Sequence, residues 1–186
     1  DVAPIILYPR RGRLWGLFEQ APVTLVDFEI GDKLNLQAAW LLRQLAAHYG
    51  AQVIHTQGPG SLDALACLAA RWATVPMVIT RPVIIDRVTL RLASRIVAVS
   101  KSGFQHLSQV SGVPAGKLTL IHNGIDTNRF FPKSNKQDAS APLMVGMVAQ
   151  LTPPKGWLDF LAVMANLVEQ RPGVRGLIIG DGPLHD

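Results

Sequence analysis

Lys155 and Gly156 stand where a loop meets a helix, and this position of the chain is the best suited to holding an anion. Residues 143–148 are apolar and predict a strand, residues 152–156 predict a loop, and residues 157–170 have the spacing of a helix. The first N–H groups of a helix are unpaired, and its dipole attracts negative charge. A lysine there can pair with a diphosphate, although a solvated lysine beside a helix-start glycine has the same local pattern.

Further polar residues and glycines follow the other apolar segments. In open α/β sheets, ligands bind beyond the carboxyl ends of the strands. An arginine at such an end suits bidentate contact with phosphate or carboxylate, and a surface arginine fits the pattern equally well. A lone histidine there usually satisfies a neighbouring backbone group. The candidates of this kind are His55, Thr80, Arg81, Asn123, Gly124, Asp126, Gln150, Gly180 and Gly182.

Several signatures of chemistry do not occur in the sequence. It has no His-Glu-x-x-His pattern, no Gly-x-Ser-x-Gly elbow and no pair of carboxylates, so hydrolytic and zinc chemistry lack support. Residues 58–60, Gly-Pro-Gly, are not followed by the third glycine of a dinucleotide fingerprint and indicate a turn. The one cysteine, Cys67, lies in an apolar run and is expected to be a small buried hydrophobe. We expect no metal site and no cofactor.

The elements that would position these residues alternate along the chain. A content of 48% hydrophobic and 17% charged residues is that of a globular protein. Apolar runs predict strands at 5–8, 23–26, 53–56, 76–80, 95–100 and 117–121, and helical spacing predicts helices at 35–48, 61–71, 86–92 and 102–110. Strands that are apolar on both faces belong to buried parallel sheets, so the sequence predicts a doubly wound α/β fold.

Residues 133–142 form the most polar stretch and predict a linker between two domains. We therefore expect one Rossmann-like domain over residues 1–132, with its first strand missing, and the start of a second over residues 143–186. One βαβ unit cannot cover both faces of a sheet, so the second domain is expected to be truncated. The sequence begins with Asp1 instead of an initiator Met, and it shows no signal-peptide pattern. This too indicates a segment of a longer chain.

The formal net charge of +5 is concentrated before residue 142, where 15 of the 18 Lys and Arg residues but only 9 of the 13 Asp and Glu residues lie. Such asymmetry suits nucleic acid, an anionic membrane surface or a phosphorylated substrate. The arginines are scattered among aliphatic residues rather than aromatic ones, so we expect no nucleic-acid partner. No window of about 18 uninterrupted apolar residues predicts a transmembrane helix.

Ordered motifs along the chain resemble the retaining glycosyltransferases of family 4, which have the GT-B fold of two facing Rossmann-like domains. The motifs are "SRIVAVS" at 94–100, "GVPAGKLTLIHNGIDTNRFFP" at 112–132 and "VGMVAQLTPPKGWLDFLAVMANLVEQRPGVRGLIIGDGP" at 145–183. Upstream, "AQVIHTQGPG" at 51–60 and "VPMVITRP" at 75–82 are similar to two strands of the family's acceptor domain. The chain would therefore cover most of an acceptor domain and the start of a donor domain.

The resemblance implies a nucleotide-sugar donor, as a substrate rather than a cofactor, and Lys155 contacting its diphosphate beside Gly156 and Gln150. Many members carry an arginine in place of Gln150, so one positive charge is missing here. Gly180 and Gly182 would lie in the donor-side loop. The family's two donor-site glutamates would fall beyond Asp186, so the catalytic carboxylates lie outside this segment, and we expect it to be inactive alone.

On the acceptor side, the resemblance implies that His55, Thr80 and Arg81 face a glycan or lipid-linked acceptor, with Asn123, Gly124 and Asp126 in the interdomain turn. The expected activity is metal-independent hexosyl transfer with retention in cell-envelope polysaccharide synthesis. The protein would be cytoplasmic, with its basic first domain suited to peripheral contact with anionic lipid at the inner face of the membrane. Two alternatives stay open: a GT-B nucleotide-sugar epimerase and a non-catalytic Rossmann-type nucleotide-binding module.

Overall fold

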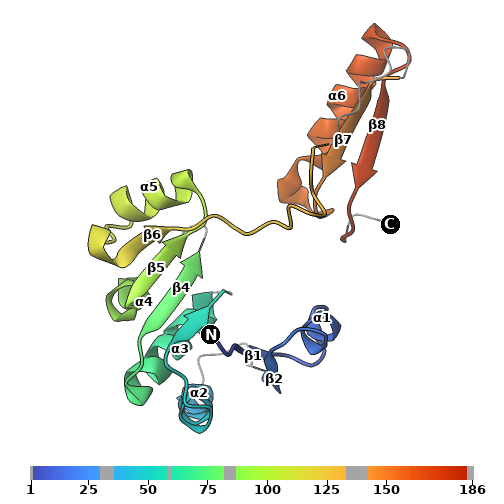
Figure 1. The fold of residues 1–186 in the computed structure, drawn as a ribbon. Helices are drawn as coiled ribbons and strands as arrows, with labels where there is room; N and C mark the ends of the chain where they lie inside the picture. Colours follow the sequence, from blue (N-terminus) through green and yellow to red (C-terminus); the bar gives the residue numbers. More distant parts are fainter. Residues whose placement is uncertain (1, 30–35, 58–59, 82–86, 133–141, 184–186) are drawn as a thin grey trace. The chain divides into compact units, whose positions relative to one another are not determined.

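The computed structural model describes residues 2–29, 36–57, 60–81, 87–132 and 142–183. The chain divides into two compact units, Asp1–Ile125 and Asp126–Asp186 (Figure 1). The linker expected at 133–142 lies outside the described residues except for its last position, and the loop at 58–60 except for Gly60. The domain limits expected at 132 and 143 stay predictions.

The first unit contains a four-stranded parallel sheet in the order β3-β4-β5-β6. Its strands are β3 (Ile54–Thr56), β4 (Met77–Arg81), β5 (Arg95–Ala98) and β6 (Leu118–Leu120). Met77 and Ile79 of β4 and Ile96 and Ala98 of β5 are each at most 1% exposed, as expected for central strands covered by helices. The predicted α/β class with a Rossmann-like parallel sheet is confirmed.

Within the described residues, four helices accompany this sheet: α2 (Leu36–His48), α3 (Gly60–Ala73), α4 (Arg87–Leu92) and α5 (Lys101–Gln109). Helix α3 contacts α2, α4 and strands β3 and β4, while α5 contacts β5 and β6. Cys67 of α3 is 2% exposed, which confirms it as a buried side chain. Helix α5 begins after Ser100, whose Oγ accepts a hydrogen bond from the Gly103 N–H at 3.0 Å, a standard N-cap contact. A 3₁₀ turn, η1 (Ala115–Lys117), precedes β6.

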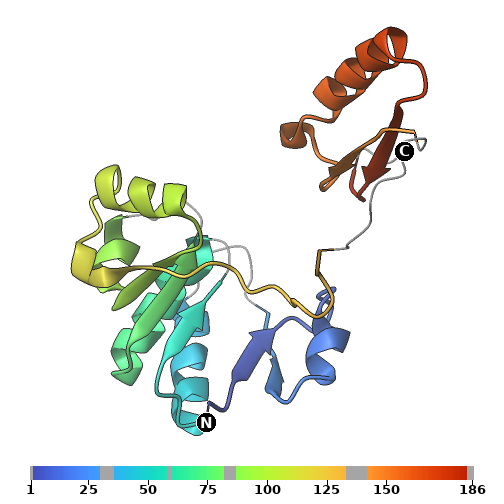
Figure 2. The same cartoon turned by 45° about the horizontal axis from the view of Figure 1, so that its top comes forward.

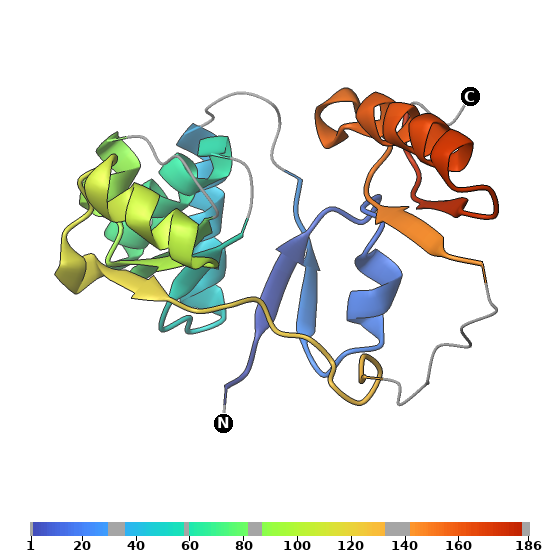
Figure 3. The same ribbon diagram turned by 90° about the horizontal axis from the view of Figure 1, so that it is seen from above.

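A second, two-stranded parallel sheet is formed by β1 (Ile5–Tyr8) and β2 (Thr24–Asp27), joined through the short helix α1 (Trp15–Glu19). Figure 3 shows α1 flanking this strand pair. Phe28, directly after β2, is 8% exposed and packs with Leu42 of α2 and Ala69 of α3. This aromatic contact ties the strand pair to the helices of the same unit.

The second unit is one βαβ motif: β7 (Met144–Val148), the 3₁₀ turn η2 (Pro153–Lys155), α6 (Trp157–Gln170) and β8 (Arg175–Ile179). The two strands are parallel, and α6 runs along one face of the pair (Figures 1 and 2). Trp157, Met164 and Val174 are buried, whereas every residue of β8 is exposed. None of the helices in the described parts of the chain is long and apolar enough to cross a membrane.

Candidate functional site

His55 and Thr80, two of the predicted acceptor-side residues, lie side by side at the carboxyl ends of β3 and β4. The parallel register places His55 opposite Val78, so Thr80 is its diagonal neighbour, two residues further along β4. His55 Nε2 lies 2.8 Å from Thr80 Oγ1, a hydrogen bond in which either group can donate, depending on the histidine tautomer. The sheet therefore brings an imidazole and a hydroxyl together at the edge where ligands of α/β proteins bind.

Burial lowers the pKa of His55 below its ordinary value of 6.5, because desolvation disfavours the imidazolium. The ring is then neutral at neutral pH, with one nitrogen able to accept a hydrogen bond and the other able to donate one. A neutral imidazole beside a hydroxyl can donate a hydrogen bond to a ligand or accept one from it.

Arg81, the third predicted acceptor-side residue, is held by a carboxylate that the sequence analysis did not single out. Its Nε donates a hydrogen bond to Asp63 Oδ2 at 2.7 Å, and its Nη2 lies 2.6 Å from the same oxygen. Asp63 Oδ1 accepts a hydrogen bond from Thr56 Oγ1 at 2.6 Å. Asp63 is only 1% exposed and Thr56 6%. The network therefore joins the first turn of α3 to the ends of β3 and β4.

Both contacts to Asp63 use the same edge of the Arg81 guanidinium. Nη2 is buried and makes no hydrogen bond of its own within the described residues, while Nη1 takes part in neither contact. Because a buried charge needs a partner, the ion pair has a structural role whatever else Arg81 does. Asp63 is the one acidic residue in the otherwise apolar run 62–70, and this isolated charge is the signal in the sequence that could have revealed it. The acceptor-facing role of Arg81 stays a prediction.

Asp126, placed by the sequence in the interdomain turn, caps that turn. Its Oδ1 accepts hydrogen bonds from the N–H groups of Asn128 at 2.9 Å and Arg129 at 3.2 Å. Asn123 and Gly124 are exposed, and a Cβ on Gly124 would meet nothing within 4 Å. The local structure thus explains Asp126, while the roles predicted for Asn123 and Gly124 stay predictions.

On the donor side, the structure places Lys155 and Gly156 at the start of α6. Gly156 has φ +73°, a left-handed conformation that favours glycine, and it joins η2 directly to the helix. Lys155 is exposed. Trp157 Nε1 donates a hydrogen bond to the Gln150 carbonyl oxygen at 2.8 Å, which fixes the end of the β7 loop against the first turn of α6. The three residues predicted for the diphosphate therefore surround one helix N-terminus.

That N-terminus is not purely positive, because Asp159 lies in the first turn of α6. Its Oδ2 is 3.5 Å from the position that a Cβ on Gly156 would occupy. A carboxylate in the first turn already complements the helix dipole. A lysine at this site therefore has a local acidic neighbour as well as the expected anionic ligand.

Gly180 and Gly182 permit a close approach between the loops that follow β7 and β8. A Cβ on Gly180 would overlap the carbonyl oxygen of Ala149, and one on Gly182 would lie 2.5 Å from the carbonyl oxygen of Leu151. The Leu151 N–H donates a hydrogen bond to the Asp181 carbonyl oxygen at 2.9 Å. This close packing explains why both positions are glycine. The donor-side role predicted for them stays a prediction.

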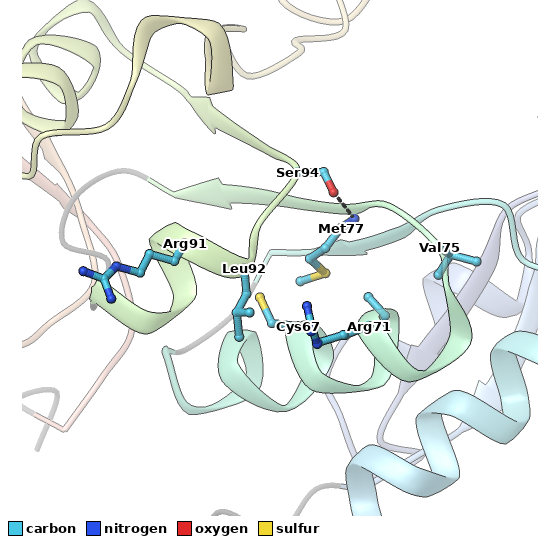
Figure 4. A pocket seen from close by; sticks show the side chains of 8 residues that line it. Cys67, Arg71, Val75, Met77, Arg91, Leu92 and Ser94 are labelled. Carbon is cyan, nitrogen blue, oxygen red and sulfur yellow. Dashed lines mark hydrogen bonds between the residues drawn. The ribbon is translucent and has the colours of Figure 1, made fainter.

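A cavity of about 200 Å³ lies elsewhere in the first unit (Figure 4). Its lining includes Cys67 and Arg71 of α3, Met77 at the start of β4 and Ser94 just before β5, with Ser94 Oγ accepting a hydrogen bond from the Met77 N–H at 3.1 Å. The cavity is therefore at the amino ends of the strands, opposite His55 and Thr80. Across the described ranges, no group of three or more His, Cys, Asp or Glu side chains is placed to hold a metal ion.

Comparison with known proteins shows which family this chain resembles. The Glycosyltransferase Family 4 model matches residues 82–129. A D-inositol 3-phosphate glycosyltransferase of Segniliparus rotundus is 28% identical over 155 residues, covering 80% of this chain and 33% of the relative. Over these residues the chain is similar to the family 4 glycosyltransferases.

Solved structures agree on the fold of this chain. A glycosyltransferase of Rickettsia africae superposes with a TM-score of 0.70 at 17% identity, covering 96% of this chain and 60% of that one. Anabaena HepE, solved in complex with UDP and glucose, gives 0.73 at 20% identity, with 96% and 53% covered. The predicted GT-B fold is confirmed, and the chain spans a third of the curated relative and just over half of the solved structures.

The same fold also occurs in a protein of different chemistry. A Listeria monocytogenes protein described as a UDP-N-acetylglucosamine 2-epimerase superposes with a TM-score of 0.59 at 13% identity, covering 96% of this chain and 54% of that one. At such identity the likeness concerns the fold alone.

Proposed function

We propose that the protein transfers a hexose from a nucleotide-sugar donor to a glycan or lipid-linked acceptor, with retention of anomeric configuration. The observation that carries the proposal is the family 4 match together with a lysine–glycine loop at the N-terminus of α6. The complex of HepE with UDP and glucose supports the donor class. Cell-envelope polysaccharide is the product class that we propose for it.

The donor diphosphate binds at the N-terminus of α6 in this proposal. Unpaired backbone N–H groups and the helix dipole attract the phosphates, and the Lys155 ammonium adds a full positive charge. These groups stabilise the negative charge that develops as the nucleoside diphosphate leaves. The exposed Gln150 can donate a neutral hydrogen bond, and its lack of charge leaves Lys155 with the larger electrostatic role.

The acceptor meets the ends of β3 and β4. There the His55–Thr80 pair orients an acceptor hydroxyl, and Arg81 offers Nη1 to an anionic or polar group of the acceptor. Asp63 holds Arg81 from behind, so the guanidinium meets the acceptor in one orientation. The two sides belong to different units of the chain, as a two-domain transferase requires.

Replacement of Lys155 by Ala in the full-length enzyme tests the donor side. We expect a lower kcat/KM. The decrease should correspond to a loss of about 1.5–3 kcal/mol of transition-state stabilisation, the range for a lost charge-assisted contact. Arg171→Ala is the matched control, because it removes one exposed positive charge at the opposite end of the same helix. Unchanged donor consumption in Lys155→Ala, or an equal loss in both variants, would contradict the assigned role.

The fold likeness to the Listeria protein keeps epimerisation as a second candidate, and a binding module without turnover as a third. Following the nucleotide-sugar with and without acceptor distinguishes the three. Transfer predicts loss of donor only when acceptor is present, with the product anomer determined by NMR. Conversion without acceptor would indicate an epimerase, and binding without any conversion would indicate the module.

A further inference from the structure

The cavity at the amino ends of β4 and β5 has positively charged side chains at its rim and an apolar wall (Figure 4). The wall includes the side chains of Cys67, Met77 and Leu92. Arg71 and Arg91, in the last turns of α3 and α4, supply the charge. The volume of about 200 Å³ compares with about 30 Å³ for one water molecule in the liquid. The cavity therefore has room for a phosphate group and a few further atoms.

Neither arginine is neutralised by the part of the chain that the structure describes. Both side chains are exposed, and neither forms an ion pair or a hydrogen bond with a described residue. In Figure 4 the Arg71 guanidinium lies beside Cys67, while Arg91 extends away from it. Because no described acceptor fixes the Arg91 side chain, rotation about its bonds can turn it toward the mouth of the cavity. Guanidinium groups bind phosphate oxygens in bidentate fashion, so this rim is suited to an oxyanion.

An arginine in the last turn of a helix can serve only to compensate the helix dipole. In α4 another residue has that role, because Lys117 Nζ donates hydrogen bonds to the carbonyl oxygens of Arg91 at 3.0 Å and Ala93 at 2.9 Å. At the end of α3, the Val75 N–H donates a hydrogen bond to the Ala70 carbonyl oxygen at 3.0 Å. Both helix ends are therefore partnered without the guanidinium groups, whose charge is left for a ligand.

Two further features belong to the same end of the sheet. Ser94 Oγ accepts a hydrogen bond from the Met77 N–H at 3.1 Å, and its own hydroxyl hydrogen has no acceptor among the described residues. Thr74, next to the lining residue Val75, has φ +59°, a left-handed conformation that is strained for a β-branched residue. Strained backbone is concentrated at ligand-binding and catalytic sites. The cavity thus combines a free neutral donor with two cationic ones, beside a strained turn.

We infer that this cavity binds the phosphate group of a small soluble molecule. Arg71 and Arg91 pair with the phosphate oxygens, and the Ser94 hydroxyl donates a hydrogen bond to one of them. The apolar wall then contacts the rest of the ligand. The site is at the edge of the sheet opposite the predicted acceptor residues, and it lies in a different unit from Lys155. The inference therefore does not rest on the proposed transferase function.

Equilibrium dialysis of radiolabelled inorganic phosphate against the full-length protein tests the site, with the ionic strength held constant by chloride. Every protein in the series carries Lys155→Ala, so that the lysine of the donor loop does not contribute. We expect saturable binding that Arg71→Gln/Arg91→Gln weakens at least about tenfold, because charge-assisted hydrogen bonds are lost. Arg71→Lys/Arg91→Lys should keep part of the binding, since it retains both charges but not the bidentate geometry.

The matched control is Arg11→Gln/Arg13→Gln, which removes two exposed arginines of the same unit that do not line the cavity. An equal loss in both glutamine pairs, or no saturable binding at millimolar phosphate, would overturn the inference. Alkylation of Cys67, followed by peptide mass spectrometry, locates the anion, because Cys67 lines the cavity. Phosphate should slow the alkylation in the control and not in Arg71→Gln/Arg91→Gln.

An alkylation rate in the control that does not change with phosphate would place the anion elsewhere and overturn the inference. Circular dichroism checks the fold of each variant. Binding of the nucleotide-sugar to the enzyme that retains Lys155, measured separately, shows whether the transferase proposal stands on its own.

Discussion

Asp63 is the residue that the structure adds to the candidate site, because its carboxylate joins the ends of β3 and β4 to α3. The ion pair with Arg81 is nearly inaccessible, and Thr56 occupies the second carboxylate oxygen. Breaking a buried pair leaves one uncompensated charge, which costs more than the pair itself contributes. Arg81 therefore cannot be freed for a ligand without a large loss of stability.

Asp63→Asn should destabilise the first unit by about 3–5 kcal/mol, because Arg81 would keep a buried charge without its partner. Asp159→Asn is the control, since Asp159 also lies in the first turn of a helix but is exposed. We expect that variant to lose only about 0.3–1 kcal/mol from the helix dipole. Urea unfolding measures both free energies. A loss below 1 kcal/mol for Asp63→Asn would contradict the buried-pair argument.

The lowered pKa of His55 predicts a pH dependence of stability. Because burial favours the neutral ring in the folded state, the unfolded chain binds more protons between the folded pKa and 6.5. Stability from this residue is therefore complete above pH 6.5 and is lost as the pH falls below it. Urea unfolding of the wild type and His55→Gln at pH 7.5 and 5.5 should show a smaller decrease in the variant. The same decrease in both proteins would show that His55 has no part in it.

The position of a single residue could be predicted where it depends only on neighbouring residues in the sequence. Lys155 and Gly156 follow from a strand, a loop and a helix in order, and the structure places them at the start of α6. Asp63 was not predictable in the same way, since its partners lie 7 and 18 residues away and meet it only after the sheet forms. Contacts between residues that depend on strand pairing cannot be predicted from local spacing in the sequence.

At the scale of elements, the hydrophobic period located strands and helices well. The runs that predict β4 and β5 are mainly apolar, and Met77, Ile79, Ile96 and Ala98 in these strands are buried. The run that predicts β7 is also mainly apolar, yet its residues are exposed or half-buried, and every residue of β8 is exposed. Periodicity reports the tendency of a segment to be extended, whereas burial depends on neighbours that the segment itself does not encode. The turns η1 and η2 were likewise not predicted, because three residues carry no period.

Gly180→Ala tests the close packing of the loops after β7 and β8. The new Cβ would overlap the Ala149 carbonyl oxygen, a backbone atom that cannot rotate away, so we expect about 1–3 kcal/mol of destabilisation. Gly146→Ala in β7 is the control, because its Cβ would make an ordinary contact at 3.9 Å. Hydrogen exchange of the β7 and β8 amides reports both changes. Equal exchange in the two variants would mean that the loops can separate without cost.

At the scale of the whole molecule, the two units differ in how much apolar surface they bury. The first unit has a continuous core between its sheet and helices. In the second unit, large side chains of both layers are exposed, including Leu158 at 80%, Val163 at 61% and Val148 at 76%. Hydrophobic burial is the dominant stabilising contribution to a fold. The difference in burial therefore implies a difference in stability within one 186-residue chain.

We accordingly expect the 186-residue chain to unfold in two steps. Native-state hydrogen exchange should show amides of β4 and β5 exchanging only at the highest free energy of opening, and those of β7 and β8 exchanging at a much lower one, because few buried contacts oppose their opening. Increasing urea should abolish protection in the second unit first. Ile79→Ala, which removes a fully buried side chain from β4, should lower protection across the first unit and leave β7 and β8 unchanged. A single transition with the same opening free energy in both units would instead show that they stabilise one another.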